Sequence, residues 1–277
     1  MTSASTDAPT RRVSAAGAEF VYRDIGSGDL PPLVGLTHLG VNLDSWDPEV
    51  VDPLVEERRV ILLGYRGVGG STGRVRESFD DAADDVIAVI RALGLERVDL
   101  LGLSMGGMVA QAVLERAPEL VDRVILAGTG PEGGPRLTAL TGVMVRSILR
   151  GVVTATDPTA LLFFTRTAGG RRAAEEYAAR LKRRRSDRDA AVTPGVFRAQ
   201  LRAVAQWGRR TAPSGRFSAP GLILHGDSDR MVPLANVAVL RARFDDAQTR
   251  IFPDSGHGVV PQNRRAVTEA ARLFLRR

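Results

Sequence analysis

Two serines of this chain lie in a Gly-x-Ser-x-Gly pattern, which can present a serine hydroxyl as a nucleophile. Ser71 lies in Gly69-Gly-Ser-Thr-Gly73, and Ser104 lies in Gly102-Leu-Ser-Met-Gly106. Only Ser104 follows an apolar run, Val98–Leu103, and precedes an amphipathic helical pattern. A sharp turn from strand to helix would lift this hydroxyl clear of the sheet, with glycines on both sides where larger side chains would collide. Ser104 is therefore the candidate nucleophile, suited to attack a carbonyl carbon.

Ser71 is the alternative, because its pentapeptide matches the pattern equally well. It lies in the glycine-rich stretch Gly67–Gly73, and the polar residues 74–77 follow it with no helix beginning on the last glycine. Such a pattern also arises by chance in a glycine-rich chain, so its structural context decides its meaning. We interpret this second copy as a flexible loop.

A serine hydroxyl needs a base beside it at neutral pH, and the chain contains three histidines. His38 begins a loop after an early strand, where a role near the oxyanion loop is more plausible than that of a base. His225 lies inside an apolar strand and is expected to be structural. His257 lies between glycines in a loop after the last strand, where its ring is free to reach across the strand ends. We predict that His257 is the general base.

The base in turn needs a carboxylate that fixes its tautomer and stabilises the imidazolium. Asp227, Asp229 and Asp254 are the candidates. Asp254 is too close in sequence to His257 to approach the far ring nitrogen easily. Asp229 lies deeper in its loop and precedes the next helix, so we favour it and keep Asp227 as the alternative.

The Met105 N–H is expected to be free at the start of the helix after Ser104, where the helix dipole favours negative charge. It is therefore a candidate donor to an oxyanion.

Apolar strand patterns alternate with amphipathic helical patterns through most of the chain, which predicts a mostly parallel sheet covered on both faces. The polar residues named above follow strands, and ligands of such sheets bind beyond the carboxyl ends of the strands. Strand patterns are absent from residues 131–217, where helical patterns continue. We predict a disordered tail over 1–12, an α/β core over 13–130 and 218–277, and a helical cap insertion over 131–217.

Composition narrows the classes of function. The 277 residues are 44% hydrophobic, enough for one large core, and contain no cysteine, so disulfides and thiolate metal sites are excluded. We expect no metal site. The net charge of +6 comes from arginines interleaved with acids, so we expect no nucleic-acid partner. With no apolar stretch long enough to span a bilayer and no secretion signal, we expect a cytoplasmic protein without a membrane partner.

The segments around Ser104, Asp229 and His257 resemble those of the α/β-hydrolase superfamily, over the chain from about residue 13 to its end. The resemblance implies an eight-stranded, mostly parallel sheet flanked by helices, an inserted helical cap, a serine triad and no cofactor. Many members have glycine where this chain has Leu39, and the second oxyanion donor is then expected to be the Gly40 N–H. Many also have an acid where this chain has Gly64, a change expected to loosen the neighbouring loop.

We therefore expect a serine hydrolase that acts on a small to medium ester or thioester through an acyl-enzyme. Lactone hydrolysis, C–C bond hydrolysis and cofactor-free perhydrolysis use the same triad and stay open, as does a non-catalytic, lyase or cyclase variant of the fold. A monomer or homodimer acting on a small acyl substrate is expected. The predicted substrate-binding residues are His38, Leu39, Trp46, Phe163 and Phe164.

Overall fold

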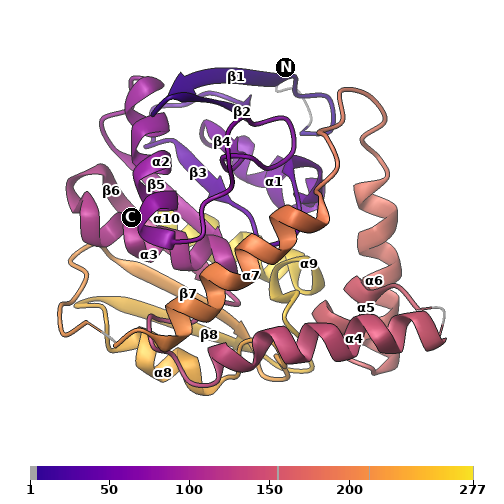
Figure 1. Ribbon diagram of the computed structural model, residues 1–277. Helices are drawn as coiled ribbons and strands as arrows, with labels where there is room; N and C mark the ends of the chain where they lie inside the picture. The colour runs from indigo at the N-terminus through magenta and orange to yellow at the C-terminus, as the bar shows by residue number, and fades with distance from the viewer. Residues whose placement is uncertain (1–4, 155, 212, 277) are drawn as a thin grey trace.

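An eight-stranded sheet in the order β1-β2-β4-β3-β5-β6-β7-β8 forms the centre of the computed structural model, which describes residues 5–154, 156–211 and 213–276 (Figure 1). β1 and β2 pair antiparallel, as do β2 and β4, and all other neighbours are parallel. The fold class predicted from the sequence is thereby confirmed. The strands are β1 (Thr10–Ala15), β2 (Ala18–Ile25), β3 (Leu33–Leu36), β4 (Val60–Leu63), β5 (Val98–Leu103), β6 (Val121–Ala127), β7 (Gly221–Gly226) and β8 (Ala247–Phe252).

Helices cover both faces of the sheet and bury apolar side chains against it. α2 (Phe79–Ala92), α3 (Met105–Arg116) and α8 (Ala235–Arg241) pack on one face. α1 (Pro48–Val55), the short α9 (Val259–Gln262) and α10 (Arg264–Leu275) pack on the other. The parallel strands β3, β5, β6 and β7 lie between these layers, so their carboxyl ends meet at one edge of the sheet.

The N-terminal boundary differs from the prediction. The polar residues of 1–12 suggested a disordered tail, yet β1 begins at Thr10 and the side chains of Ser5 and Ala8 are buried. Arg184 explains the order: its guanidinium donates to the carbonyls of Thr6 and Ala8, both at 3.0 Å. The predicted tail is therefore wrong for residues 5–12, while residues 1–4 lie outside the described part of the chain.

Four longer helices lie between β6 and β7, within the predicted insertion 131–217, for which we keep the name cap. They are α4 (Leu140–Thr154), α5 (Pro158–Phe163), α6 (Ala168–Leu181) and α7 (Pro194–Arg209). Side-chain oxygens cap three of them: those of Asp157, Thr167 and Thr193 accept from backbone amides in the first turns of α5, α6 and α7.

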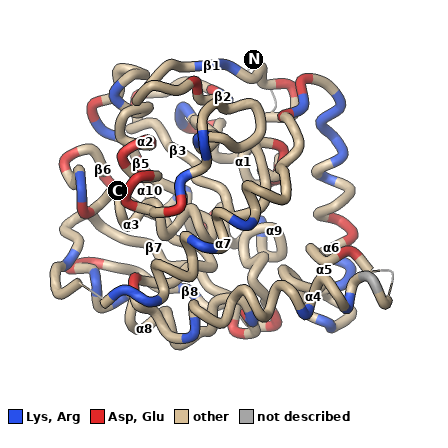
Figure 2. The backbone as a smooth tube through the Cα atoms, in the orientation of Figure 1, with Lys and Arg blue, Asp and Glu red and all other residues tan. Residues whose placement is uncertain are grey.

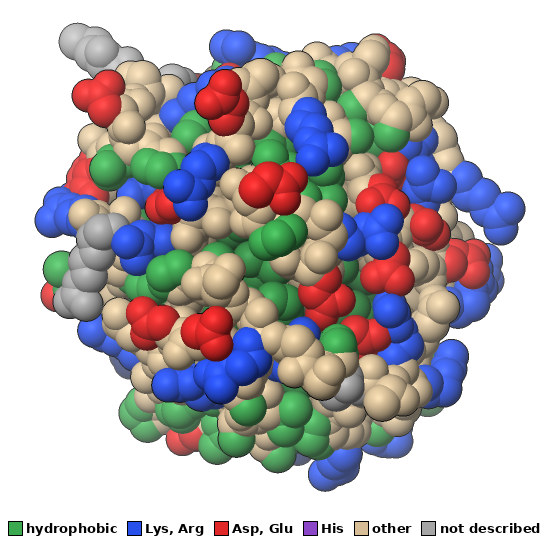
Figure 3. Space-filling view, turned by 90° about the vertical axis from the view of Figure 1, so that its left-hand side faces the viewer, with side chains coloured by type: hydrophobic (Ala, Val, Ile, Leu, Met, Phe, Trp, Pro, Cys, Tyr) green, Lys and Arg blue, Asp and Glu red, His purple; other side chains and the backbone are tan. Residues whose placement is uncertain are grey.

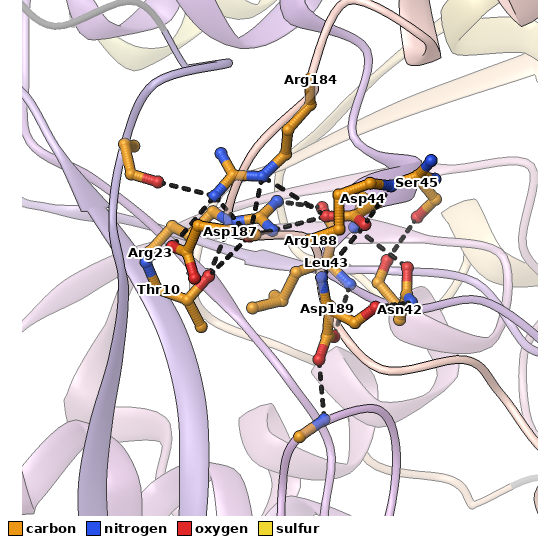
Figure 4. Close-up of polar contacts among 12 residues, drawn as sticks. Thr10, Arg23, Asn42, Leu43, Asp44, Ser45, Arg184, Asp187, Arg188 and Asp189 are labelled. Atoms are coloured by element: carbon orange, nitrogen blue, oxygen red, sulfur yellow. Dashed lines mark hydrogen bonds and ion pairs between the residues drawn. The ribbon is translucent and has the colours of Figure 1, made fainter.

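The segment after α6 binds the core through buried and partly buried charges (Figure 4). The Asp44 carboxylate accepts from Arg23 at 2.5 Å and lies 3.6 Å from Arg184. Asp189 accepts from the Gly70 N–H at 2.7 Å and from the Leu43 N–H at 3.1 Å. Charges buried in this way need partners, so this network fixes the C-terminal half of the cap to the core.

Charges of both signs are interspersed along the backbone (Figure 2) and on the molecular face drawn in Figure 3. Within the described residues, the helices are too short or too polar to cross a membrane.

Candidate active site

Ser104 lies at a sharp turn between β5 and α3, with φ +52° and ψ −114°. This left-handed backbone is strained for a residue with a side chain, and such strain is typical of functional positions. Close packing explains the flanking glycines: a Cβ on Gly106 would lie 2.0 Å from the Leu36 carbonyl oxygen, and one on Gly102 would lie 2.6 Å from the Gly107 Cα. The turn at Ser104 therefore requires glycine at positions 102 and 106.

Two hydrogen bonds join the predicted nucleophile, base and acid into one chain. The Ser104 Oγ lies 2.8 Å from the His257 Nε2, and the His257 Nδ1 lies 2.8 Å from the Asp229 Oδ2. All three residues are buried, which strengthens such charge-assisted bonds. The structure thus brings together three residues that lie at 104, 229 and 257 in the sequence.

The Asp229 carboxylate is held in place by its own loop. Its Oδ1 accepts from the N–H groups of Met231 and Val232 at 2.8 and 2.9 Å, which leaves Oδ2 for the histidine. The other two candidates bind elsewhere: Asp227 accepts from the Ser255 N–H at 3.2 Å, and Asp254 accepts from the Thr167 hydroxyl at 2.8 Å. The geometry therefore selects Asp229 among the three.

The other two histidines remain neutral near pH 7. Burial and the nearby His257 lower the pKa of His38 to about 4. Burial also lowers the pKa of His225, whose Nε2 lies 2.9 Å from the Val232 carbonyl oxygen. His225 thus has the structural role expected of it, and it supports the loop that carries Asp229.

The two predicted oxyanion donors differ in their surroundings. The Met105 N–H is the first amide of α3 and has no partner within the helix. The Gly40 N–H instead donates to the Oε1 of Gln200 at 2.7 Å. Gln200 is a buried residue of α7, so a cap side chain occupies the position at which an oxyanion would accept from Gly40.

A cavity of about 30 Å³ adjoins Ser104 and His257. Three of the predicted substrate-binding residues line it: His38, Trp46 and Phe163. The Phe163 ring lies edge-on to both histidine rings, with centroid distances of 4.8 Å to His38 and 5.4 Å to His257. This segment of the cap therefore contacts His257 and lines the same cavity as Ser104.

The other two predicted substrate-binding residues do not line this cavity. Leu39 packs into the core on the face of α2 and α3, and Phe164 packs against Tyr177 within the cap. Both assignments as substrate-binding residues stay predictions.

Sequence reasoning missed Gln200 and Tyr177. Tyr177 lines the cavity, and its hydroxyl donates to the Ser45 carbonyl at 3.0 Å. Both residues lie on cap helices, at positions that helical periodicity marks as buried. Periodicity does not show which part of the core a buried cap residue faces, so the sequence offered no signal for either.

Comparisons with known proteins bear on the fold and the family of this chain. The profile of the alpha/beta hydrolase fold family matches residues 31–263. The 2-hydroxymuconate semialdehyde hydrolase of a Pseudomonas species is 28% identical, with 89% of this chain and 87% of that protein covered. The non-heme haloperoxidase of Rhodococcus erythropolis is 26% identical over 94% of this chain and 96% of its own. An alpha/beta hydrolase fold protein from Chitinophaga pinensis superposes with a TM-score of 0.93 at 27% identity, covering 99% of both chains.

Proposed function

Since the chain belongs to the alpha/beta hydrolase fold family, we propose that it is a serine hydrolase that cleaves a small carboxylic ester or thioester through an acyl-enzyme. The observation that carries the proposal is the continuous hydrogen-bonded chain from Asp229 through His257 to Ser104. The hydrolase relatives support the same class of reaction.

In the first step, the His257 Nε2 takes the Ser104 proton while the Oγ attacks the substrate carbonyl carbon. Asp229 stabilises the imidazolium through the Nδ1–H bond. The carbonyl oxygen gains negative charge and accepts from the Met105 N–H at the start of α3, where the helix dipole also favours it. The imidazolium then protonates the leaving alkoxide or thiolate, and the acyl group remains on Ser104.

In the second step, His257 removes a proton from water as the water oxygen attacks the acyl carbon. The Ser104 Oγ leaves and takes the proton back from the imidazolium, which releases the acid and restores the resting state. The Gly40 N–H joins Met105 as an oxyanion donor once the Gln200 side chain withdraws from it.

The cavity beside Ser104 favours a short acyl group. A single water needs about 10–15 Å³ of comparable volume, so a cavity of about 30 Å³ holds no more than a few heavy atoms. Trp46 and Phe163 supply apolar walls that suit a short alkyl chain. Longer chains would require the cap to move.

A panel of p-nitrophenyl esters with acyl chains of increasing length tests this proposal. We expect the highest kcat/KM for the acetyl ester, a steady decline with length, and no activity above background in Ser104→Ala. Equal rates for the wild type and Ser104→Ala would contradict the mechanism. A maximum at a long chain would keep the mechanism and reject the short-acyl specificity.

A second candidate activity is perhydrolysis, which the likeness to a non-heme haloperoxidase favours. In that reaction hydrogen peroxide replaces water in the second step, and a peracid leaves instead of an acid. Bromide oxidation that requires acetate, peroxide and Ser104 would support it. Bromide oxidation that persists in Ser104→Ala would exclude it.

A further inference from the structure

A second opening, a groove of about 730 Å³, lies between the cap and the loop after β7. Five arginines line it: Arg136 before α4, Arg146 and Arg150 on α4, Arg166 after α5, and Arg230 next to the triad carboxylate. Figure 2 shows basic positions along α4 and near α5. We call this opening the arginine groove.

The charge of the arginine groove is not balanced by the protein. Many arginines of the chain bind an acidic side chain, as Arg180 binds Asp47 at 2.7 Å. In the part of the chain that the structure describes, none of the five groove arginines forms an ion pair with an acidic side chain. Among the described residues that line the groove, Asp229 is the only acid, and its carboxylate is buried and hydrogen-bonded to His257.

The like charges also act on one another. Burial lowers the pKa of Arg230, and the charges of Arg166 and Arg150 lower it further. Its guanidinium is oriented by a hydrogen bond to the carbonyl of Leu161 in α5. Several cations around one groove repel each other, and an anion bound among them removes that repulsion.

The number and type of cations favour a phosphate. A carboxylate would offset only one of the five charges, whereas a phosphate or diphosphate carries two or more. The planar guanidinium also binds two oxygens of a phosphate at once. We propose that the arginine groove binds the phosphate or diphosphate group of a small molecule.

The place of the groove relative to the triad is also informative. The Leu161 carbonyl of α5 accepts from the groove residue Arg230, and Phe163 of the same helix lies against the His257 ring. One short helix therefore separates a phosphate in the groove from the nucleophile. The phosphate can be part of the acyl substrate, and this alternative rests on the proposed function. It can also be a free anion that acts on the cap. Binding itself does not depend on catalysis.

Calorimetric titration of inorganic diphosphate into Ser104→Ala at about 0.15 M salt tests the site without hydrolysis. On this background, Arg150→Gln with Arg166→Gln removes two groove charges. The matched control, Arg198→Gln with Arg250→Gln, removes two exposed arginines outside the groove. Charge-assisted hydrogen bonds to phosphate predict a loss of about tenfold or more for the groove pair and less than about twofold for the control pair. Unchanged thermal unfolding in both pairs shows that each is folded.

Two results would overturn the proposal: no binding of diphosphate to the unmodified groove, or equal losses in the two pairs. Equal losses would mean that net charge alone attracts the anion.

A kinetic experiment with the wild type distinguishes the two sources of the phosphate. Competition between diphosphate and acetyl-coenzyme A, with p-nitrophenyl acetate hydrolysis unaffected, assigns the phosphate to the substrate. A changed rate on the neutral ester assigns it to a free anion. If the neutral ester is not hydrolysed at all, the proposed function fails, while the calorimetric result on the groove still stands.

Discussion

Two loops of this protein share the pattern Gly-x-Ser-x-Gly and use it in opposite ways. At the turn after β5, the backbone of Ser104 is strained and its Oγ lies 2.8 Å from an imidazole nitrogen. In the loop Gly67–Gly73, the Oγ of Ser71 accepts from the Val21 N–H at 3.0 Å and only joins the loop to β2. The residues that follow decide the difference, because a helix begins directly after Ser104 and not after Ser71.

The glycine loop has a role of its own, which is to hold the cap. Its Gly70 N–H donates to Asp189 of the cap, and its Gly70 carbonyl accepts from Arg12 of β1. A Cβ on Gly64, which follows β4, would lie 2.9 Å from the Val21 carbonyl oxygen and 3.2 Å from the Ser71 Oγ, so the chain packs closely at this position. The expected loosening of the loop stays a prediction. One loop thus carries the proposed nucleophile, and the other binds the cap.

Replacing Ser104 and Ser71 by alanine, one at a time, should give the largest difference in activity between two variants. For Ser104→Ala we expect kcat/KM on a short ester to fall by about 10⁴-fold or more, because the nucleophile is lost. For Ser71→Ala we expect kcat/KM within about threefold of the wild type and a free energy of unfolding lower by about 1 kcal/mol, since the Val21 N–H loses its acceptor. Steady-state kinetics and urea unfolding measure both. A large loss of activity in Ser71→Ala would contradict a purely structural role for Ser71.

Substitutions of Asp229 and Asp227, which lie in one loop, should give the next largest difference in activity. Asp229→Asn should lower kcat by about 10³–10⁴-fold, because the amide favours the wrong histidine tautomer. Asp227→Asn leaves the His257 ring untouched and should keep most of the activity. Stopped-flow acylation rates for the two variants measure the difference. Similar losses of activity in both variants would mean that Asp227 also acts on His257.

Gln200→Ala tests the second predicted oxyanion donor, the Gly40 N–H. Removing the amide oxygen frees the Gly40 N–H for an oxyanion, and a bond of about 1 kcal/mol corresponds to about a fivefold rise in kcat/KM. Gln200→Glu serves as the partner variant: a carboxylate would hold the same N–H more tightly and should lower the rate. If both variants lost activity equally, Gln200 would have a purely structural role.

Asp189→Ala tests whether the glycine loop holds the cap. Two backbone N–H groups of the core, those of Leu43 and Gly70, would lose their acceptor. We therefore expect a free energy of unfolding lower by about 2 kcal/mol and a Tm lower by about 5 °C. KM should rise while kcat stays near that of the wild type, because the triad is not touched. The exposed Asp29 supplies the control, Asp29→Ala, for which calorimetry should find no shift. Equal Tm values for the two variants would remove the proposed role of the loop.

The comparison of the two loops also shows which features of the structure could be predicted from the sequence. The turn at Ser104 and the positions of Asp229 and His257 were predictable because alternating strands and helices place the strand ends along one edge of the sheet. The roles of these residues in catalysis stay a prediction. The fold class followed from the same alternation.

Contacts between the cap and the core were not predictable in this way. The bonds of Gln200 to Gly40 and of Asp189 to Gly70 join residues more than a hundred positions apart. No periodic pattern encodes such pairs, because they depend on how the cap helices sit on the core. The order of residues 5–12 was missed for the same reason, since Arg184 of the cap supplies the hydrogen bonds that fix them.

The central claim, that Ser104 and not Ser71 is an activated nucleophile, is tested most directly by covalent labelling. The wild type is treated with a fluorophosphonate, and the modified peptide is identified by mass spectrometry. We predict a single adduct on Ser104 and strongly reduced labelling in His257→Ala. A label on Ser71, or full labelling of Ser104 without the histidine, would contradict the account.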